Sequence, residues 1–164
     1  MRLTLWTDYS LRVLMYCAAC TDRAQPVTIV EIARAHGISR HHLTKVVMML
    51  AALGYVETTR GRGGGLRLLV AADRVTVGEV LRRTETDLRL LECFDAEANT
   101  CRLDGQCRLQ CLLQGAMARF LETMDACTLA DLVTPGVRGL CQAAAGSQAV
   151  ALPTARSAPV AGSR

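Results

Sequence analysis

The chain has 164 residues, of which 51% are hydrophobic and only 4% are aromatic. This length and composition allow one domain with an aliphatic core, plus a modest appendage. No apolar run is long enough to span a bilayer, and the N-terminus lacks the apolar stretch of a signal peptide. We therefore expect a cytoplasmic protein, in which eight cysteines indicate metal binding, redox sensing or burial rather than structural disulfides.

The charge of the chain is unevenly distributed. The net charge is +4 at neutral pH, but residues 28–70 hold six basic and two acidic side chains together with all three histidines. Residues 92–131 hold seven acidic side chains and three arginines. This asymmetry predicts that the first segment meets a polyanion and that the second does not.

The first third of the chain predicts three helices. An apolar pattern over residues 8–20 indicates the first of them. Thr28 and Glu31 form a capping box that begins a short second helix, and Gly37 ends that helix in a left-handed turn. A third helix follows over residues 40–53, with apolar side chains at helical spacing.

A hairpin and a fourth helix come next. Two β-like segments, residues 55–59 and 66–70, flank the loop 60–65, whose four glycines allow a tight turn. A second capping box, residues 76–79, begins a helix that ends near residue 84.

The order of these elements is the pattern of a winged helix-turn-helix. The predicted fold is therefore mainly α, with a small β-hairpin wing and a long helix further along the chain. The start of the second helix of the pair enters the major groove in such folds, and a basic wing suits the minor groove or the flanking phosphates. The residues predicted to contact DNA are Ser39, Arg40, His41, His42 and Lys45 on the helix and Arg60, Arg62 and Gly63 in the wing.

Two other interpretations compete for these basic and glycine-rich segments. A basic face is often only a solvated surface, which is an adequate explanation for any single arginine. The glycine-rich loop also resembles a cradle for the phosphate of a nucleotide. That interpretation is disfavoured because the loop leads into a second strand, so that no helix N-terminus completes the anion site.

Three cysteines with the spacing Cys93-x7-Cys101-x5-Cys107 lie in a segment of weak periodicity before the long helix. Thiolates in a loop can converge on an iron–sulfur cluster, and the fourth ligand can be of another kind. Zinc is an alternative, because Cys107 and Cys111 have a spacing that suits a tetrahedral site. The spacing alone does not choose between the two metals.

The other four cysteines are interpreted as structural. Cys17 and Cys20 lie in an apolar helix, where cysteine behaves as a small hydrophobic residue. Cys127 and Cys141 have no partner pattern. No nucleophile–base pair or pair of carboxylates indicates an enzyme, and we therefore expect none.

The chain thus divides into three parts. Residues 1–84 form the predicted DNA-binding domain, and residues 85–134 hold the cysteine loop and a long amphipathic helix over 107–125. Residues 135–164 are rich in Ala, Gly, Ser, Pro and Val without useful periodicity. We expect this last part to be a disordered tail.

Motifs spread over residues 1 to about 134 resemble one known family. They are Met1-Arg2-Leu3-Thr4, Thr7-Asp8-Tyr9-Ser10-Leu11-Arg12, Gly61-Arg62-Gly63-Gly64-Gly65-Leu66-Arg67-Leu68, Glu92-Cys93-Phe94, Cys107-Arg108-Leu109 and Thr128-Leu129-Ala130-Asp131-Leu132. Together they resemble the NsrR family of nitric-oxide-sensing repressors, winged-helix regulators whose relatives include IscR.

This resemblance implies a homodimer that binds an inverted-repeat operator in double-stranded DNA, with the long helix at the dimer interface. It also implies an iron–sulfur cluster held by Cys93, Cys101 and Cys107, of the 4Fe–4S rather than the 2Fe–2S type. The fourth ligand in such relatives is an aspartate from the other subunit, and its motif matches Asp8.

The identity of the fourth ligand has competing interpretations. IscR-type relatives place a histidine three residues after the third cysteine, where this chain has Gln110, so the NsrR pattern fits better. Asp8 also lies in the first turn of a helix, where a carboxylate is favoured by the helix dipole alone. Cys111 is a further candidate for the fourth ligand.

The function that the resemblance implies is that of a transcriptional repressor which senses nitric oxide through its cluster, nitrosylation releasing it from DNA. An alternative within the same family is a regulator that responds to redox state or to cluster supply. A zinc-structural or electron-transfer protein is a third interpretation, of a different class.

Overall fold

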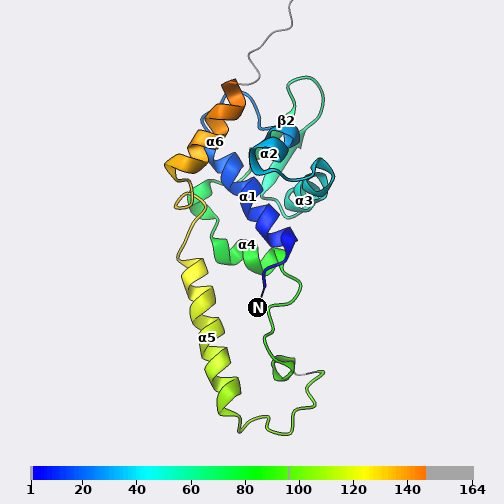
Figure 1. Ribbon diagram of the computed structural model, residues 1–164, viewed down its shortest axis with the longest axis vertical. Helices are drawn as coiled ribbons and strands as arrows, with labels where there is room; N and C mark the ends of the chain where they lie inside the picture. Colours follow the sequence, from blue (N-terminus) through cyan, green and yellow to red (C-terminus); the bar gives the residue numbers. More distant parts are fainter. Residues whose placement is uncertain (1, 96, 147–164) are drawn as a thin grey trace, which may run out of the picture.

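The computed structural model describes residues 2–95 and 97–146 (Figure 1). Its elements, in chain order, are α1 (Leu5–Ala19), α2 (Ile29–His36), α3 (Arg40–Ala52), β1 (Val56–Thr59), β2 (Gly65–Leu68), η1 (Ala72–Arg74), α4 (Val77–Thr84), η2 (Glu92–Phe94), α5 (Arg108–Asp125) and α6 (Pro135–Gly146). The mainly helical fold with one small hairpin is confirmed. No helix in the described ranges is both long and apolar enough to cross a membrane.

Helix α1 lies at the centre of the fold, in contact with α2, α3, α4, α6 and β2 (Figure 1). It begins at Leu5 with Thr4 as its cap, three residues earlier than predicted. Its buried side chains join those of α2, α3 and the hairpin in one cluster, which includes Leu14, Ile32 and Leu43. The core is aliphatic, as the low aromatic content predicts.

The helix-turn-helix forms as its local signals predict. The Glu31 amide donates to Thr28 Oγ1 at 3.1 Å, and the Thr28 amide donates to Glu31 Oε2 at 3.4 Å, which completes the capping box of α2. Gly37 ends α2 at φ 64°, a conformation that glycine adopts without strain. Ile38 is then buried between α2 and α3. Ser39 stands at the cap position of α3 but makes no side-chain hydrogen bond there.

The wing is an antiparallel hairpin in which Val56 pairs with Leu68 and Thr59 pairs with Gly65. Leu66 also exchanges two main-chain hydrogen bonds with Val27, at 3.0 and 2.6 Å. The wing is therefore attached to the segment that leads into α2. A Cβ atom at Gly65 would lie 2.5 Å from the Val27 carbonyl oxygen, so this close approach requires glycine.

The second capping box forms only in part. Thr76 Oγ1 accepts a hydrogen bond from the Glu79 amide at 3.1 Å. The Glu79 carboxylate does not return to Thr76 but accepts a hydrogen bond from the Tyr55 hydroxyl at 2.8 Å. Glu79 thus connects α4 to the start of the wing.

Helix α5 extends away from the body of the molecule, and only its C-terminal end is attached to α4 (Figure 1). Arg82 and Asp125 form a double ion pair with both N–O distances at 2.6 Å. The Val77 amide donates to the Cys127 carbonyl at 2.8 Å, and Leu129 is fully buried beyond the end of α5. None of the eighteen residues of α5 is buried.

The prediction of a disordered tail from residue 135 is wrong for Pro135–Gly146, which forms α6. This helix packs against α1 and α2. Cys141 on α6 is buried and forms a disulfide with Cys20 at the end of α1, so Cys141 does have a partner. Sequence periodicity misses α6 because alanine and glycine dilute its apolar side and a cysteine makes the contact. Residues 147–164, the rest of the predicted tail, lie outside the described residues.

Candidate DNA interface and cysteine loop

The exposed side of α3 presents the predicted DNA-contacting residues. The apolar side chains of the same helix face the core: Leu43, Val46, Val47 and Leu50 are buried. The polar side of its first turns is exposed, and this set comprises Arg40, His41, His42 and Lys45 together with Ser39 just before the helix. The arrangement leaves donors at the N-terminal end of α3 available to phosphates or base edges.

The wing places Arg60, Arg62 and Gly63 on the surface of the loop between β1 and β2. Within residues 2–95 and 97–146, the side chains of Arg60 and Arg62 form no salt bridge. Two such unpaired cations at the tip of a hairpin suit contact with a polyanion.

Arg67 has a different role from the other wing arginines. Its Nη1 donates to the Arg23 carbonyl at 3.1 Å, and its Nη2 donates to the Ala24 carbonyl. Arg67 therefore holds β2 against the segment that follows α1. The sequence counts it among the basic residues of the segment but gives no signal for this inward contact.

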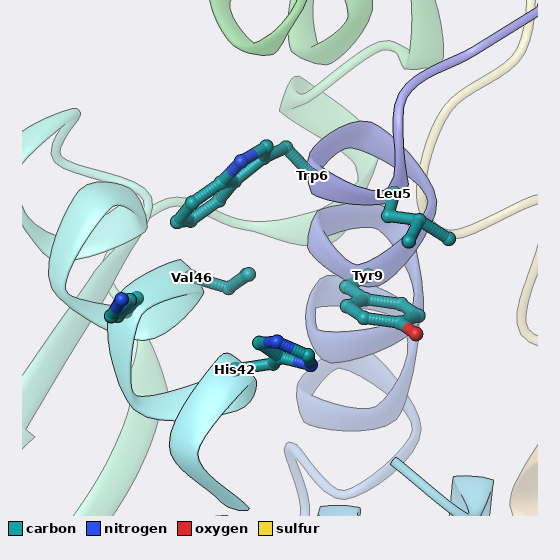
Figure 2. Close-up of a pocket in the computed structure, with 6 residues that line it drawn as sticks. Leu5, Trp6, Tyr9, His42 and Val46 are labelled. Carbon is teal, nitrogen blue, oxygen red and sulfur yellow. The ribbon is translucent and has the colours of Figure 1, made fainter. Parts of the chain in front are cut away.

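A cavity of about 230 Å³ separates the start of α1 from α3. Figure 2 shows Trp6 and Tyr9 of α1 facing Val46 and His42 of α3 across it. The rings of Tyr9 and His42 lie 6.4 Å apart. The cavity thus brings the first turns of α1 next to His42, which belongs to the predicted DNA-contacting set. Sequence reasoning did not single out Trp6 or Tyr9 for this position.

The three loop cysteines are free and half-buried, whereas Cys111 is free and exposed. Cys93 lies in η2, and Cys107 is the residue that caps α5. The loop between them is ordered by local bonds, in which Thr100 donates to Glu92 Oε1 from its amide at 2.8 Å. This hydrogen bond brings Thr100 next to Glu92, so that residues before and after the first cysteine lie together near the N-terminal end of α5.

Gln110 ties the two ends of this loop together. Its Nε2 donates to the Cys93 carbonyl at 3.4 Å and to Asp104 Oδ1 at 2.9 Å. Gln110 stands at the position that was compared above with the histidine of IscR-type relatives. Its side chain holds Cys93 and Asp104 from the first turn of α5.

The surroundings of Cys93 favour its protonated thiol. The pKa of the Cys93 thiol is raised, first by its partial burial and next by the neighbouring Cys101. Within the described ranges, no three His, Cys, Asp or Glu side chains are arranged to hold a metal ion. The donor set still fits an iron–sulfur cluster chemically, since three free thiols lie in one loop.

Asp8 is placed on α1 and is not gathered with the loop cysteines of the same chain. Both of its carboxylate oxygens accept hydrogen bonds from Arg12, at 2.9 Å each. It also lies in the first turn of α1, where the helix dipole favours a carboxylate. Asp8 is therefore not positioned, within the described residues, to hold a metal together with the loop cysteines of its own chain.

The structure combines a helix-turn-helix whose second helix is basic and exposed, a hairpin wing attached to it, and a projecting helix. These features define the class of winged-helix DNA-binding regulators. Comparison with known proteins gives the family. Residues 3–135 match the Rrf2 model, described as "Iron-dependent Transcriptional regulator". The chain belongs to the Rrf2 family.

Two similar proteins are regulators that carry the name NsrR. The chain is 47% identical over 133 residues to the HTH-type transcriptional regulator NsrR of Geobacillus kaustophilus, covering 81% of this chain and 90% of that one. It is also 47% identical over 134 residues to NsrR of Bacillus subtilis, with the same coverage. The resemblance to NsrR regulators is thereby confirmed, and the chain is a transcription regulator that binds DNA.

A solved structure of a more distant protein supports the fold alone. CymR, the global cysteine regulator of Bacillus subtilis, superposes with a TM-score of 0.67 at 24% identity. The match covers 81% of this chain and 96% of CymR. The winged-helix architecture therefore persists at low sequence identity.

Proposed function

We propose that this protein is a transcriptional repressor that senses nitric oxide through an iron–sulfur cluster, nitrosylation releasing it from operator DNA. The observation that carries the proposal is the set of free, half-buried thiols of Cys93, Cys101 and Cys107 in one loop at the end of α5. The identity of 47% to regulators named NsrR supports it. We place this activity in the cytoplasm, where bacterial DNA lies.

The residues that would hold the cluster are the three loop cysteines and Asp8 of a second copy, with Cys111 as the alternative fourth ligand. A bound cluster, of the 4Fe–4S type in this proposal, supplies iron to which nitric oxide binds. Arg12 holds Asp8 until the partner loop approaches, and Gln110 keeps Cys93 next to α5. Cluster ligands taken from two chains would connect the loop of one subunit to the first helix of the other.

The exposed apolar side of α5 supports a homodimer. Leu109 is 54% exposed and Leu112 is 68% exposed, although both are large and apolar. Covering such side chains with the same helix of a second copy would remove them from water. The dimer would present two α3 helices to an inverted repeat, whose half-sites lie about 34 Å apart.

The fixed spacing of the half-sites explains how a change in the dimer would release the protein from DNA. The first turns of α1 carry both Asp8 and the residues that line the cavity against α3. A change at the Asp8 contact would therefore shift α1 relative to the DNA-reading helices. Because the distance between half-sites is fixed by one turn of DNA, a small rotation of each α3 is enough to weaken binding.

The test is a nitric oxide titration of the anaerobically purified full chain. Metal and sulfide analysis and native mass spectrometry first establish the cluster, and an operator is selected from random duplexes by the cluster-loaded protein. We expect the affinity for this duplex to fall at least 10-fold on nitrosylation. Unchanged affinity would reject nitric oxide sensing, and zinc without iron or sulfide would reject the cluster.

The fourth ligand is tested in the same preparation. Asp8→Asn should lower cluster retention while Arg12→Ala, which frees the carboxylate, should not. Loss of the cluster in Cys111→Ser with full retention in Asp8→Asn would instead assign Cys111.

A second candidate is a regulator of the same family that responds to cluster supply or redox state. The family description, "Iron-dependent Transcriptional regulator", favours it. Operator affinity that follows reversible oxidation and reduction of the cluster, and is insensitive to nitric oxide, would select this candidate.

A further inference from the structure

A covalent bond fastens α6 to the DNA-binding part of the chain. Cys20 follows the last residue of α1, and Cys141 lies on α6, 121 residues further along the chain. Their Cα atoms are 6.1 Å apart, and each residue is only 4% exposed. Neither cysteine belongs to the loop that would hold a cluster, so this pair is a separate sulfur site.

A cation lies beside both sulfur atoms. Arg23 Nη1 is 3.8 Å from Cys20 Sγ and 3.7 Å from Cys141 Sγ. The same nitrogen donates to Glu31 Oε1, which fixes the guanidinium in place. A guanidinium next to a cysteine stabilises the thiolate, which is the form that attacks a disulfide. The guanidinium can therefore stabilise a thiolate at either sulfur once the bond is reduced, with part of its charge offset by Glu31.

Cys20 is nearly buried but lies at the wall of a surface cleft. It lines a cleft of about 80 Å³ on the side of the wing, between the end of α1 and β2. Cys17 lines the same cleft, but its thiol stays protonated because burial and the nearby Glu31 raise its pKa to about 12. Of the two cysteines at this cleft, only Cys20 has the cation beside it.

We propose that Cys20 and Cys141 form a reversible thiol–disulfide site, which low-molecular-weight disulfides oxidise and thiols reduce, and which controls the attachment of α6. In the oxidising direction the Cys20 thiolate attacks one sulfur of a disulfide RSSR, which forms a mixed disulfide and releases one RSH after protonation. The Cys141 thiolate then attacks Cys20 Sγ and releases the second RSH. Two protein thiols and one RSSR thus become one protein disulfide and two RSH.

The contacts of Arg23 and Glu31 connect this site to the DNA-reading unit. The other oxygen of Glu31 accepts the Thr28 amide in the capping box of α2. The Arg23 carbonyl accepts a hydrogen bond from Arg67, which holds the wing. The Tyr16 hydroxyl donates to Glu31 at 3.0 Å and lies 3.4 Å from the Leu140 carbonyl of α6. Release of α6 would therefore loosen both α2 and the wing.

The experiment uses the full chain, purified and handled without oxygen, in buffers of reduced or oxidised glutathione. Free thiols are alkylated under denaturing conditions, and the chain is digested without reductant. We expect a cross-linked Cys20–Cys141 peptide in oxidised samples and two alkylated peptides in reduced samples. Amide hydrogen exchange in α6 should be at least 10-fold faster in the reduced protein.

Variants separate the site from general effects of cysteine loss. Reduction should lower the melting temperature of the wild-type chain by about 10 °C, and Cys141→Ser should abolish this difference between buffers. Cys127→Ser, outside the site, should retain it. Comparing the two buffers within each variant removes any folding defect of the substitution itself.

Two results would overturn the proposal. One is the absence of the cross-linked peptide after every oxidising incubation, and the other is equal α6 exchange in the two buffers. Neither depends on the iron–sulfur cluster, because the cross-linked peptide and the α6 amides are followed individually in protein with or without metal.

Discussion

The side-chain amide of Gln110 donates to the main-chain carbonyl of Cys93 across the open end of the cysteine loop, at 3.4 Å. The same amide donates to Asp104 at 2.9 Å. One side chain of α5 thus holds both the first cysteine and the middle of the loop. Residues that hydrogen-bond to metal ligands without touching the metal commonly lower the metal affinity by about 10–100-fold when they are removed.

The first prediction concerns this residue. Gln110→Ala should leave the thiols intact but free Cys93 from α5, so that a bound cluster is lost to a chelator about 10-fold faster. The decay of the cluster absorption under anaerobic conditions measures the rate. Gln142→Ala, at an exposed glutamine on α6, is the control and should decay as the wild type does. Equal rates for all three proteins would show that Gln110 has no positioning role.

The second prediction concerns the close approach of the wing to Val27. In Gly65→Ala the new Cβ would lie 2.5 Å from the Val27 carbonyl oxygen and 2.9 Å from Pro26 Cβ, so the backbone must shift. We expect a loss of about 1–3 kcal/mol in the free energy of unfolding, measured by urea titration. Gly139→Ala in α6 is the matched control, because among the described residues an added Cβ there meets no atom of another segment within 4 Å.

The control should be neutral or more stable by up to about 1 kcal/mol, since alanine is the better helix former. A Gly65→Ala protein as stable as the wild type would show that the wing is not fixed to Val27 in solution.

The third prediction is a pH dependence that arises from His36. The pKa of His36 is lowered, first by burial and next by the charge of Arg12. Within the described residues its Nε2 is buried and has no hydrogen-bond partner. The neutral imidazole is therefore favoured in the folded state. Its contribution to stability is present above the unfolded pKa of about 6.5 and is lost as pH falls through the lower folded value.

We expect the free energy of unfolding to decrease between pH 6.5 and pH 5, with part of that decrease absent in His36→Gln. His41→Gln, at an exposed histidine of α3, should retain the full decrease. Urea titrations at several pH values measure it, and identical pH profiles for the two variants would refute the role of His36.

His36 also marks the limit of what the sequence predicts. All three histidines occur in the basic segment, but the sequence does not say that His36 turns inward against Tyr16, with ring centroids 5.7 Å apart, while His41 and His42 stay exposed. By contrast, the capping box at Thr28 and the left-handed Gly37 act within one turn of chain. Such local signals are complete in the sequence itself.

Long-range contacts account for the parts that were missed. The Cys20–Cys141 bond joins residues 121 positions apart, and α6 is helical while it packs on α1 and α2. Val137, Leu140 and Cys141 stand at helical spacing in α6, but this apolar stripe is short and does not indicate that the helix packs on α1 and α2. The spacing of Cys93, Cys101 and Cys107 indicated a ligand set, but the role of Gln110 depends on how the loop folds back onto α5. The sequence shows that Gln110 can donate hydrogen bonds, but its acceptors at Cys93 and Asp104 follow only from the folded loop.

The final prediction concerns the wing arginines. Arg60 and Arg62 are exposed on the loop between β1 and β2 and form no salt bridge in the described part of the chain. If each contacts a phosphate, neutralising it removes one released counterion from the binding equilibrium. Arg60→Ala and Arg62→Ala should each weaken binding to any duplex and reduce the slope of log K against log salt by about 1.

Fluorescence anisotropy with a random-sequence duplex at several salt concentrations measures both effects. Arg138→Ala removes the same charge from the exposed surface of α6 and should leave the slope unchanged. Arg67→Ala should act differently again, because Arg67 holds β2 through the carbonyls of Arg23 and Ala24. It should lower the stability of the fold together with DNA affinity. A wing variant with a wild-type slope would mean that the hairpin does not touch the phosphates and that α3 binds DNA without it.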